Sequence, residues 1–82
     1  MKHFVYILQS TKDYKFYIGY TANLKRRVDY HNLGINTSTK FRRPLKLIHF
    51  EEFPDKKSAL KREKQIKSYK GGEAFKKLLK TQ

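Results

Sequence analysis

The chain contains no cysteine, few acidic residues and no long apolar segment. The absence of cysteine excludes disulfide bonds, zinc–thiolate sites and thiol nucleophiles. The N-terminal apolar run Phe4–Leu8 is shorter than the core of a signal peptide, which needs about 7–15 residues. No segment approaches the ~20 apolar residues of a membrane-spanning helix. These absences favour a cytoplasmic protein that does not act on membranes.

The shortage of acidic residues leaves a large positive charge. Against 7 Asp and Glu stand 20 Lys and Arg, so that the formal net charge is +13 on 82 residues. Residues 1–41 hold 7 basic and 2 acidic residues, and residues 42–82 hold 13 and 5, which is typical of a basic globular surface rather than a basic tail. Such a surface attracts polyanions and releases their counterions. We therefore expect a nucleic-acid partner, although charge alone also suits a ribosome-bound protein or a basic fold without a specific partner.

Length and pattern predict one small domain over residues 1–82, without repeats or linkers, acting as a monomer. Strands are expected at His3–Gln9, Phe16–Thr21 and Leu45–Phe53, and helices at Ala22–Asn32, Lys56–Tyr69 and Glu73–Lys80. Thr21 and Asp55 are the expected N-caps of the first two helices. The order ββαβαα predicts an α+β fold in which helices flank a three-stranded, mainly antiparallel sheet.

The first helix carries polar residues on its apolar side. At 100° per residue, Leu24, Val28 and His31 share a sector and Arg27 lies at its edge. Arg27 and His31 are four residues apart and therefore neighbours. An arginine directed toward a core needs an anionic partner. The alternative is that Arg27 packs its methylene groups against apolar surface while its guanidinium reaches water, and that His31 lies at the boundary between core and solvent.

The second helix shows the same anomaly with the opposite sign. Ala59, Leu60 and Ile66 define its apolar arc, and Glu63 falls inside that arc. A half-buried carboxylate needs a cation, which is either a basic side chain such as Arg27 or a metal ion. The pattern leaves both the internal ion pair and the metal site open.

Two tyrosines lie on the first two strands. A hairpin across the short turn can bring the hydroxyls of Tyr6 and Tyr17 together on one face. Tyrosines in strands also serve packing alone, which is the alternative. Gly19 weakens its strand, and its presence indicates close approach of a ligand or of another backbone.

These residues stand in a familiar arrangement: Val5-Tyr6-Ile7, then Tyr17-Ile18-Gly19, then Arg27 with His31 four residues later, and the segment 58–67 around Glu63. The arrangement resembles the GIY-YIG nucleases over about residues 3–70, and in particular their small stand-alone bacterial members. The first motif has Phe4-Val5-Tyr6 in place of Gly-Ile-Tyr, and Tyr20 stands where repair-type members carry lysine. No appended DNA-recognition domain is seen.

The resemblance implies a divalent-metal-dependent endonuclease that hydrolyses phosphodiester bonds of DNA, or of RNA, with DNA repair as an associated process. It implies catalytic roles for Tyr6, Tyr17, Arg27, His31 and Glu63, with Glu63 as the ligand of Mg²⁺ or Mn²⁺. Arg27 would stabilise charge on phosphate oxygens, and Tyr6 would help to deprotonate water, aided by Tyr17 or His31. That role requires the metal or Arg27 to lower the tyrosine pKa from about 10.

Retention of all five residues favours the enzyme over its alternative, a non-catalytic nucleic-acid-binding module on the same fold. An inward acid opposes phosphate binding unless a cation bridges the two. The expected contacts to the nucleic-acid backbone are Lys25, Arg26, Lys40, Arg42, Arg43 and Lys67. Binding through such contacts should weaken steeply with salt and show little sequence preference.

Overall fold

The computed structural model describes residues 2–35 and 39–80. Its elements are β1 (His3–Ser10), β2 (Phe16–Thr21), α1 (Leu24–Asn32), a 3₁₀ turn η1 (Lys40–Arg42), β3 (Leu45–Phe53), α2 (Lys56–Ser68) and α3 (Glu73–Lys80). The α+β order ββαβαα is confirmed, and η1 adds a short turn between α1 and β3. No helix within these ranges is long and apolar enough to cross a membrane.

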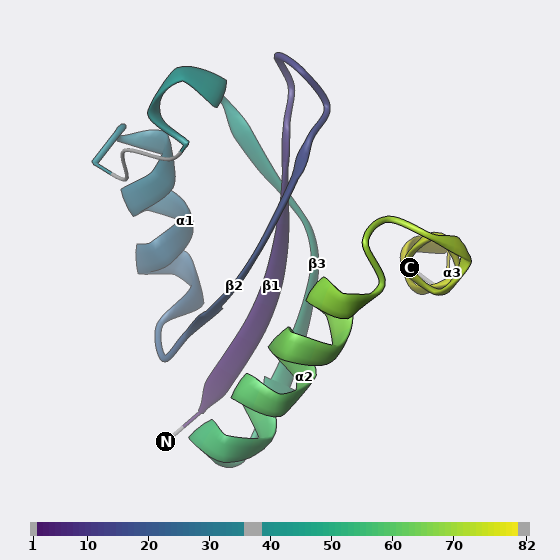
Figure 1. Cartoon of the computed structure of the whole chain (residues 1–82). Helices are drawn as coiled ribbons and strands as arrows, with labels where there is room; N and C mark the ends of the chain where they lie inside the picture. The colour runs from purple at the N-terminus through teal and green to yellow at the C-terminus, as the bar shows by residue number, and fades with distance from the viewer. Residues whose placement is uncertain (1, 36–38, 81–82) are drawn as a thin grey trace.

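The sheet is antiparallel with strand order β2-β1-β3, so that β1 lies in the centre. Helix α1 covers one face, and α2 covers the other (Figure 1). Because side chains alternate along β1, the strand contributes to two cores. Val5 and Ile7 pack in the core that includes α2 and α3, whereas Tyr6 and Leu8 pack in the core on the α1 side. This double coverage explains why β1 is buried almost throughout.

The register of the hairpin places the two motif tyrosines on one face. Tyr6 lies opposite Gly19, and Leu8 lies opposite Tyr17. Tyr6 and Tyr17 are therefore diagonal neighbours on the face toward α1, as the hairpin predicted. Because Gly19 has no side chain, the position opposite Tyr6 on β2 is left open on this face.

The start of α1 differs from the sequence-based expectation. Asn23, rather than Thr21, is the N-cap, because its side chain accepts a hydrogen bond from the backbone N–H of Arg26 at 3.1 Å. The Thr21 hydroxyl instead accepts from the backbone N–H of Asn23 at 3.1 Å and closes the turn before the helix. Both residue types are good N-caps, so sequence alone could not separate them. At α2 the expected cap is confirmed, since Asp55 accepts from the backbone N–H of Ser58 at 2.7 Å.

An ion-pair network attaches α2 to β3. Arg62 donates to both carboxylate oxygens of Glu51, at 2.8 and 3.1 Å, and His49 lies 2.7 Å from the same carboxylate. A two-pronged contact of this kind fixes orientation as well as distance. Leu60, expected in the apolar arc of α2, is 39% exposed. The helix is therefore oriented partly by charge, which its apolar pattern does not encode.

Candidate active site at the β2 edge

Three of the five expected catalytic residues, Tyr6, Tyr17 and His31, line a cavity of about 370 Å³ beside the edge strand β2, whereas Arg27 and Glu63 are not in its lining. The cavity is lined by Tyr6, Phe16, Tyr17, Ile18, His31, Thr39 and Lys67. These residues come from β1, β2, α1, α2 and the segment before η1. Since α1 and α2 cover opposite faces of the sheet, the edge of β2 is where side chains from both helices can reach one site (Figure 1).

A chain of three hydrogen-bonded side chains forms the buried end of this cavity. The Tyr6 hydroxyl lies 3.2 Å from Nε2 of His31, and Nδ1 of His31 lies 2.9 Å from the Thr39 hydroxyl. All three side chains are buried. In the tautomer that carries its proton on Nδ1, His31 donates to Thr39 and accepts from Tyr6 through Nε2. Thr39 was not expected at the site, because a threonine in a polar loop has no periodicity that would place it.

Gly19 is needed because the Tyr6 ring crosses its backbone. A Cβ atom at Gly19 would lie 2.3 Å from the Tyr6 hydroxyl oxygen and 2.5 Å from Cζ of the ring. The expected close approach is thus made by a side chain of the central strand rather than by a ligand or a backbone. Glycine at this position lets the hydroxyl of a central-strand residue extend across β2 toward its edge.

Gly19→Ala is therefore expected to destabilise the protein by about 1–3 kcal/mol, the usual cost of overpacking. The variant Tyr6→Leu removes the atoms that would clash, so Gly19→Ala should cost much less in that background. Urea unfolding of the four proteins of this cycle measures the coupling. An equal cost of Gly19→Ala in both backgrounds would show that the Tyr6 ring is not the reason for the glycine.

Burial and the charges of Arg27 and Glu63 set the protonation states of the hydrogen-bonded Tyr6 and His31 side chains. Burial raises the pKa of Tyr6, the Arg27 charge lowers it, and the Glu63 charge raises it, with a net upward shift. Burial and then the Arg27 charge lower the pKa of His31. Arg27 thus acts on Tyr6 in the expected direction, but burial outweighs it in the protein itself. At neutral pH Tyr6 is a phenol and His31 is a neutral imidazole, which can accept a proton.

Arg27 borders the site without an internal anionic partner. Its side chain is half-buried, and its Cζ lies 5.6 Å from the centre of the Tyr30 ring. Among the residues that the structure describes, no hydrogen bond or ion pair holds its guanidinium. It lines a second cavity of about 390 Å³ at the start of α1. A half-buried, unpaired guanidinium next to an open cavity is suited to binding an anion.

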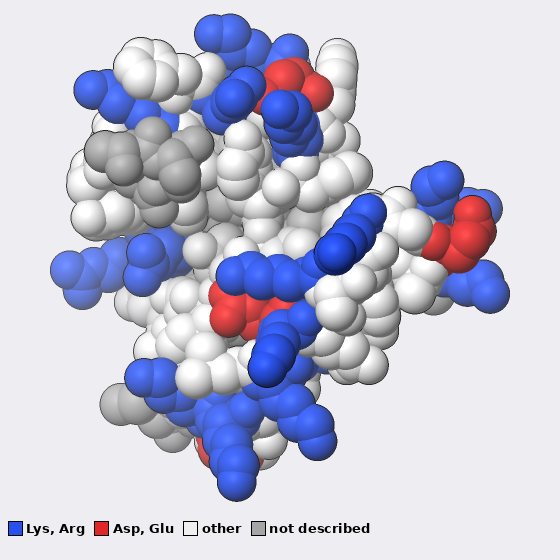
Figure 2. Space-filling view, viewed as in Figure 1, with Lys and Arg blue, Asp and Glu red and all other residues white. Residues whose placement is uncertain are grey.

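Glu63 pairs with Lys67 rather than with Arg27. The Nζ of Lys67 lies 3.3 Å from Oε2 of Glu63, one turn along α2, and the Glu63 side chain is 19% exposed. The internal Arg27–Glu63 ion pair, one of the two alternatives for this acid, is not formed. Figure 2 shows acidic atoms at the centre of the face between α1 and α2, with basic side chains around them.

The residues present allow a metal ion with few protein ligands. No group of three or more His, Asp or Glu side chains in residues 2–35 and 39–80 could enclose an ion. One carboxylate, that of Glu63, is nevertheless compatible with Mg²⁺, which commonly binds one or two carboxylates and keeps water and phosphate oxygens as its other ligands.

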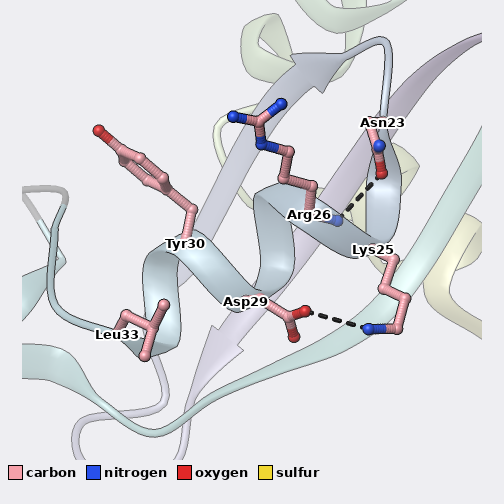
Figure 3. A pocket seen from close by; sticks show the side chains of 6 residues that line it. All are labelled: Asn23, Lys25, Arg26, Asp29, Tyr30 and Leu33. Atoms are coloured by element: carbon pink, nitrogen blue, oxygen red, sulfur yellow. Dashed lines mark hydrogen bonds and ion pairs between the residues drawn. The ribbon is translucent and has the colours of Figure 1, made fainter.

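The six expected nucleic-acid contacts fall into different places. Lys25 and Arg26 line a cavity of about 330 Å³ on α1 (Figure 3), and Arg26 also lines the cavity that holds Arg27. Lys67 lines the Tyr6 cavity, and Lys40 and Arg43 line a further cavity at η1. The Arg42 guanidinium is bound within the protein by Asp13. Of the six, only Lys67 lines the Tyr6 cavity, and Figure 2 shows that Lys and Arg side chains are spread over the face that it draws.

Comparison with known proteins places this site in a family. Residues 2–76 match the GIY-YIG catalytic domain. The chain belongs to the GIY-YIG family. Members of this family are nucleases, and their substrates are nucleic acids, which agrees with the charge of +13.

The relatives of this GIY-YIG protein are small UPF0213 proteins. It is 46% identical over 68 residues to one from Haloquadratum walsbyi, covering 82% of this chain and 75% of the relative. One from Staphylococcus haemolyticus is 44% identical over 69 residues, covering 83% of each. The solution NMR structure of a UPF0213 protein from Bacillus halodurans is similar with a TM-score of 0.56 and 34% identity, covering 99% of this chain and 84% of that one.

Proposed function

We propose that this protein is a divalent-metal-dependent endonuclease that hydrolyses phosphodiester bonds of DNA, with RNA as the alternative substrate. The observation that carries the proposal is the hydroxyl of Tyr6, a cavity-lining residue: it is hydrogen-bonded to a neutral histidine and is subject to the charges of Arg27 and Glu63. A module that only binds nucleic acid would not need a buried phenol–imidazole chain. We propose further that the chain acts as one domain and as a monomer.

In this mechanism the chain's own groups move one proton and neutralise charge. The hydroxyl of Tyr6 passes its proton to Nε2 of His31 and takes a proton from the attacking water. Thr39 holds the His31 ring and accepts the Nδ1 proton in the tautomer whose Nε2 is free to accept. Arg27 donates hydrogen bonds to nonbridging phosphate oxygens as their charge grows. Tyr17, on the same wall of the cavity, orients the water or the phosphate.

The carboxylate of Glu63 would hold the Mg²⁺ or Mn²⁺ ion, together with water and substrate oxygens. When bound, such an ion supplies Lewis-acid activation of the phosphoryl group and shields the leaving oxygen. Lys67, released from Glu63 or still beside it, would contact a neighbouring phosphate. The proposal therefore assigns Glu63 a second function, metal binding, in addition to its ion pair with Lys67.

The purified protein should cleave nucleic acid in Mg²⁺ or Mn²⁺ and lose cleavage in EDTA while it still binds. The measurement uses labelled single-stranded, duplex and branched DNA and the matching RNAs, with each ion and with EDTA, analysed on denaturing gels. Binding measured in EDTA is the control for substrate access. Retention of binding with no cleavage of any substrate in either ion would instead support the non-catalytic module, and cleavage that persists in EDTA would contradict the metal requirement.

A further inference from the structure

The turn η1 presents an aromatic ring to solvent. Phe41 is 74% exposed, and no other large apolar side chain in the described residues is more exposed. A single exposed apolar residue is ordinary, but its surroundings decide whether it is a site. Here the ring lies in the lining of a cavity of about 460 Å³, together with Lys12, Asn32, Lys40, Arg43 and Pro44.

The exposure of Phe41 is not the result of a loose loop. The Ser10 hydroxyl donates to the carbonyl of Arg42 at 2.6 Å, and the Arg42 guanidinium pairs with Asp13. The Thr11 backbone N–H donates to the carbonyl of Pro44 at 3.0 Å. These contacts attach the C-terminal end of the turn to the β1–β2 hairpin, while Thr39 at its start is hydrogen-bonded to His31 of α1. The backbone that carries the ring is therefore fixed on both sides. A ring on a backbone that is already ordered requires less ordering of the chain when a ligand binds.

Positive charge surrounds the ring. The Nζ of Lys40 lies 5.6 Å from the centre of the Phe41 ring. Arg43 is fixed by a 2.8 Å hydrogen bond from its Nε to the carbonyl of Lys40, and its guanidinium packs over Gly34, where a Cβ atom would lie 2.7 Å from Nη1. The described lining contains no acidic residue. An aromatic face flanked by cations is the combination that binds unpaired nucleobases and their phosphates.

The turn also adjoins the candidate active site. Thr39, which lines the Tyr6 cavity and bonds to His31, directly precedes η1. Only Lys40 separates Thr39 from Phe41, so their Cα atoms are within about 7 Å of each other. A strand held at one cavity can therefore reach the other within a few nucleotides.

We propose that Phe41 is a stacking platform for an unpaired nucleobase close to the scissile phosphate, with Lys12, Lys40 and Arg43 holding the adjacent phosphates. The inference rests on the proposed nuclease function and names its substrate class, which is nucleic acid with unpaired bases. Stacking between successive base pairs covers both faces of each base inside a duplex, so the interior of an intact duplex cannot use the platform. Single-stranded DNA and single-stranded RNA offer the same base face.

The test is binding in EDTA, where no cleavage occurs. Phe41→Ala should bind a fluorescent single-stranded oligonucleotide about 5- to 150-fold more weakly, the usual range when a stacking aromatic is replaced by alanine. Phe41→Tyr keeps the ring and should bind within about 2-fold of the wild type. Leu33→Ala, which removes an apolar side chain that is 70% exposed at the end of α1, is the matched control and should be neutral.

Further arms separate stacking from charge. The salt dependence should be unchanged in Phe41→Ala, since no charge is removed, and shallower in Lys40→Gln. A blunt duplex should bind the wild type and Phe41→Ala with equal affinity. An oligonucleotide made of abasic sites should likewise bind the two proteins with equal affinity, because it offers no base to stack. Parallel single-stranded DNA and RNA probes show which polymer is bound more tightly.

Circular dichroism confirms that each variant is folded. A folded Phe41→Ala that binds single strands as the wild type does would overturn the stacking proposal. If the wild type binds through Phe41 yet never cleaves in Mg²⁺ or Mn²⁺, the nuclease proposal fails while the stacking proposal stands. The two proposals therefore fail on different measurements.

Discussion

Replacing Arg27 by alanine is expected to reduce phosphodiester cleavage by roughly 10²-fold or more while nucleic-acid affinity changes little. The guanidinium has no ion-pair partner among the residues that the structure describes, so its charge is available to the substrate. It is half-buried beside the cavity, where a charge acts more strongly than in water. Its effect should therefore be largest in the transition state, when charge on the phosphate oxygens is greatest.

The same variant should alter the pH dependence of the reaction. Arg27 lowers the pKa of His31, so its removal raises that pKa. His31 must be neutral to accept a proton, and the acid limb of the pH–rate profile should therefore move to higher pH. Arg27→Lys keeps the positive charge but lacks the planar guanidinium. It should therefore keep the acid limb of the pH–rate profile close to its wild-type position, while the cleavage rate stays well below that of the wild type.

Arg26→Ala is the matched control for Arg27→Ala. Arg26 is the neighbouring arginine of α1, is exposed and lines the cavity of Figure 3. Its loss should weaken binding slightly and leave the cleavage rate at saturation unchanged. Initial rates over a range of substrate concentration, with thermal melting of each variant, provide the measurement. Equal losses in the two variants, or wild-type cleavage by Arg27→Ala, would remove the catalytic role of Arg27.

Glu63→Gln should abolish metal-dependent cleavage and leave binding in EDTA unchanged or tighter. The amide keeps the shape of the side chain but removes the charge that a divalent ion needs. Its loss also removes a negative charge from a phosphate site, which favours binding. The Glu63 carboxylate has an internal partner in Lys67, an i,i+4 pair of a kind worth about 0.3–0.5 kcal/mol. Stability should therefore fall by less than about 1 kcal/mol.

Glu73→Gln supplies the control, because it also removes an acid from a short-range helical pair. Glu73 pairs with Lys76 at 3.9 Å on α3, and its side chain is 84% exposed. This variant should cleave like the wild type. Cleavage rates across a Mg²⁺ and Mn²⁺ titration, with melting temperatures from the same preparations, decide the question. A destabilised Glu63→Gln protein with wild-type activity would show that the carboxylate serves structure and not the metal.

Much of the fold followed from local pattern. The three strands, the three helices and the Asp55 cap are set by neighbouring residues, and the structure confirms them. The sequence could not decide whether Thr21 or Asn23 caps α1, because both side chains accept hydrogen bonds well at a helix start. The conformation of the turn selects Asn23. The sequence also did not predict the orientation of α2, because Arg62 pairs with the carboxylate of Glu51 on β3, which is not a neighbour in the sequence.

By itself the sequence determined which residues are out of place: an arginine and a histidine on one apolar helix face, an acid in another, and a glycine inside a strand. Polar residues at core positions signal function because burial without a partner is costly. Only the tertiary structure decided the partners. In the folded protein Glu63 pairs with Lys67, and Arg27 has no ion-pair partner among the described residues. The Tyr6 ring lies across Gly19, and Thr39 is hydrogen-bonded to His31. Those choices depend on the spacing of elements that pack together, which no local pattern records.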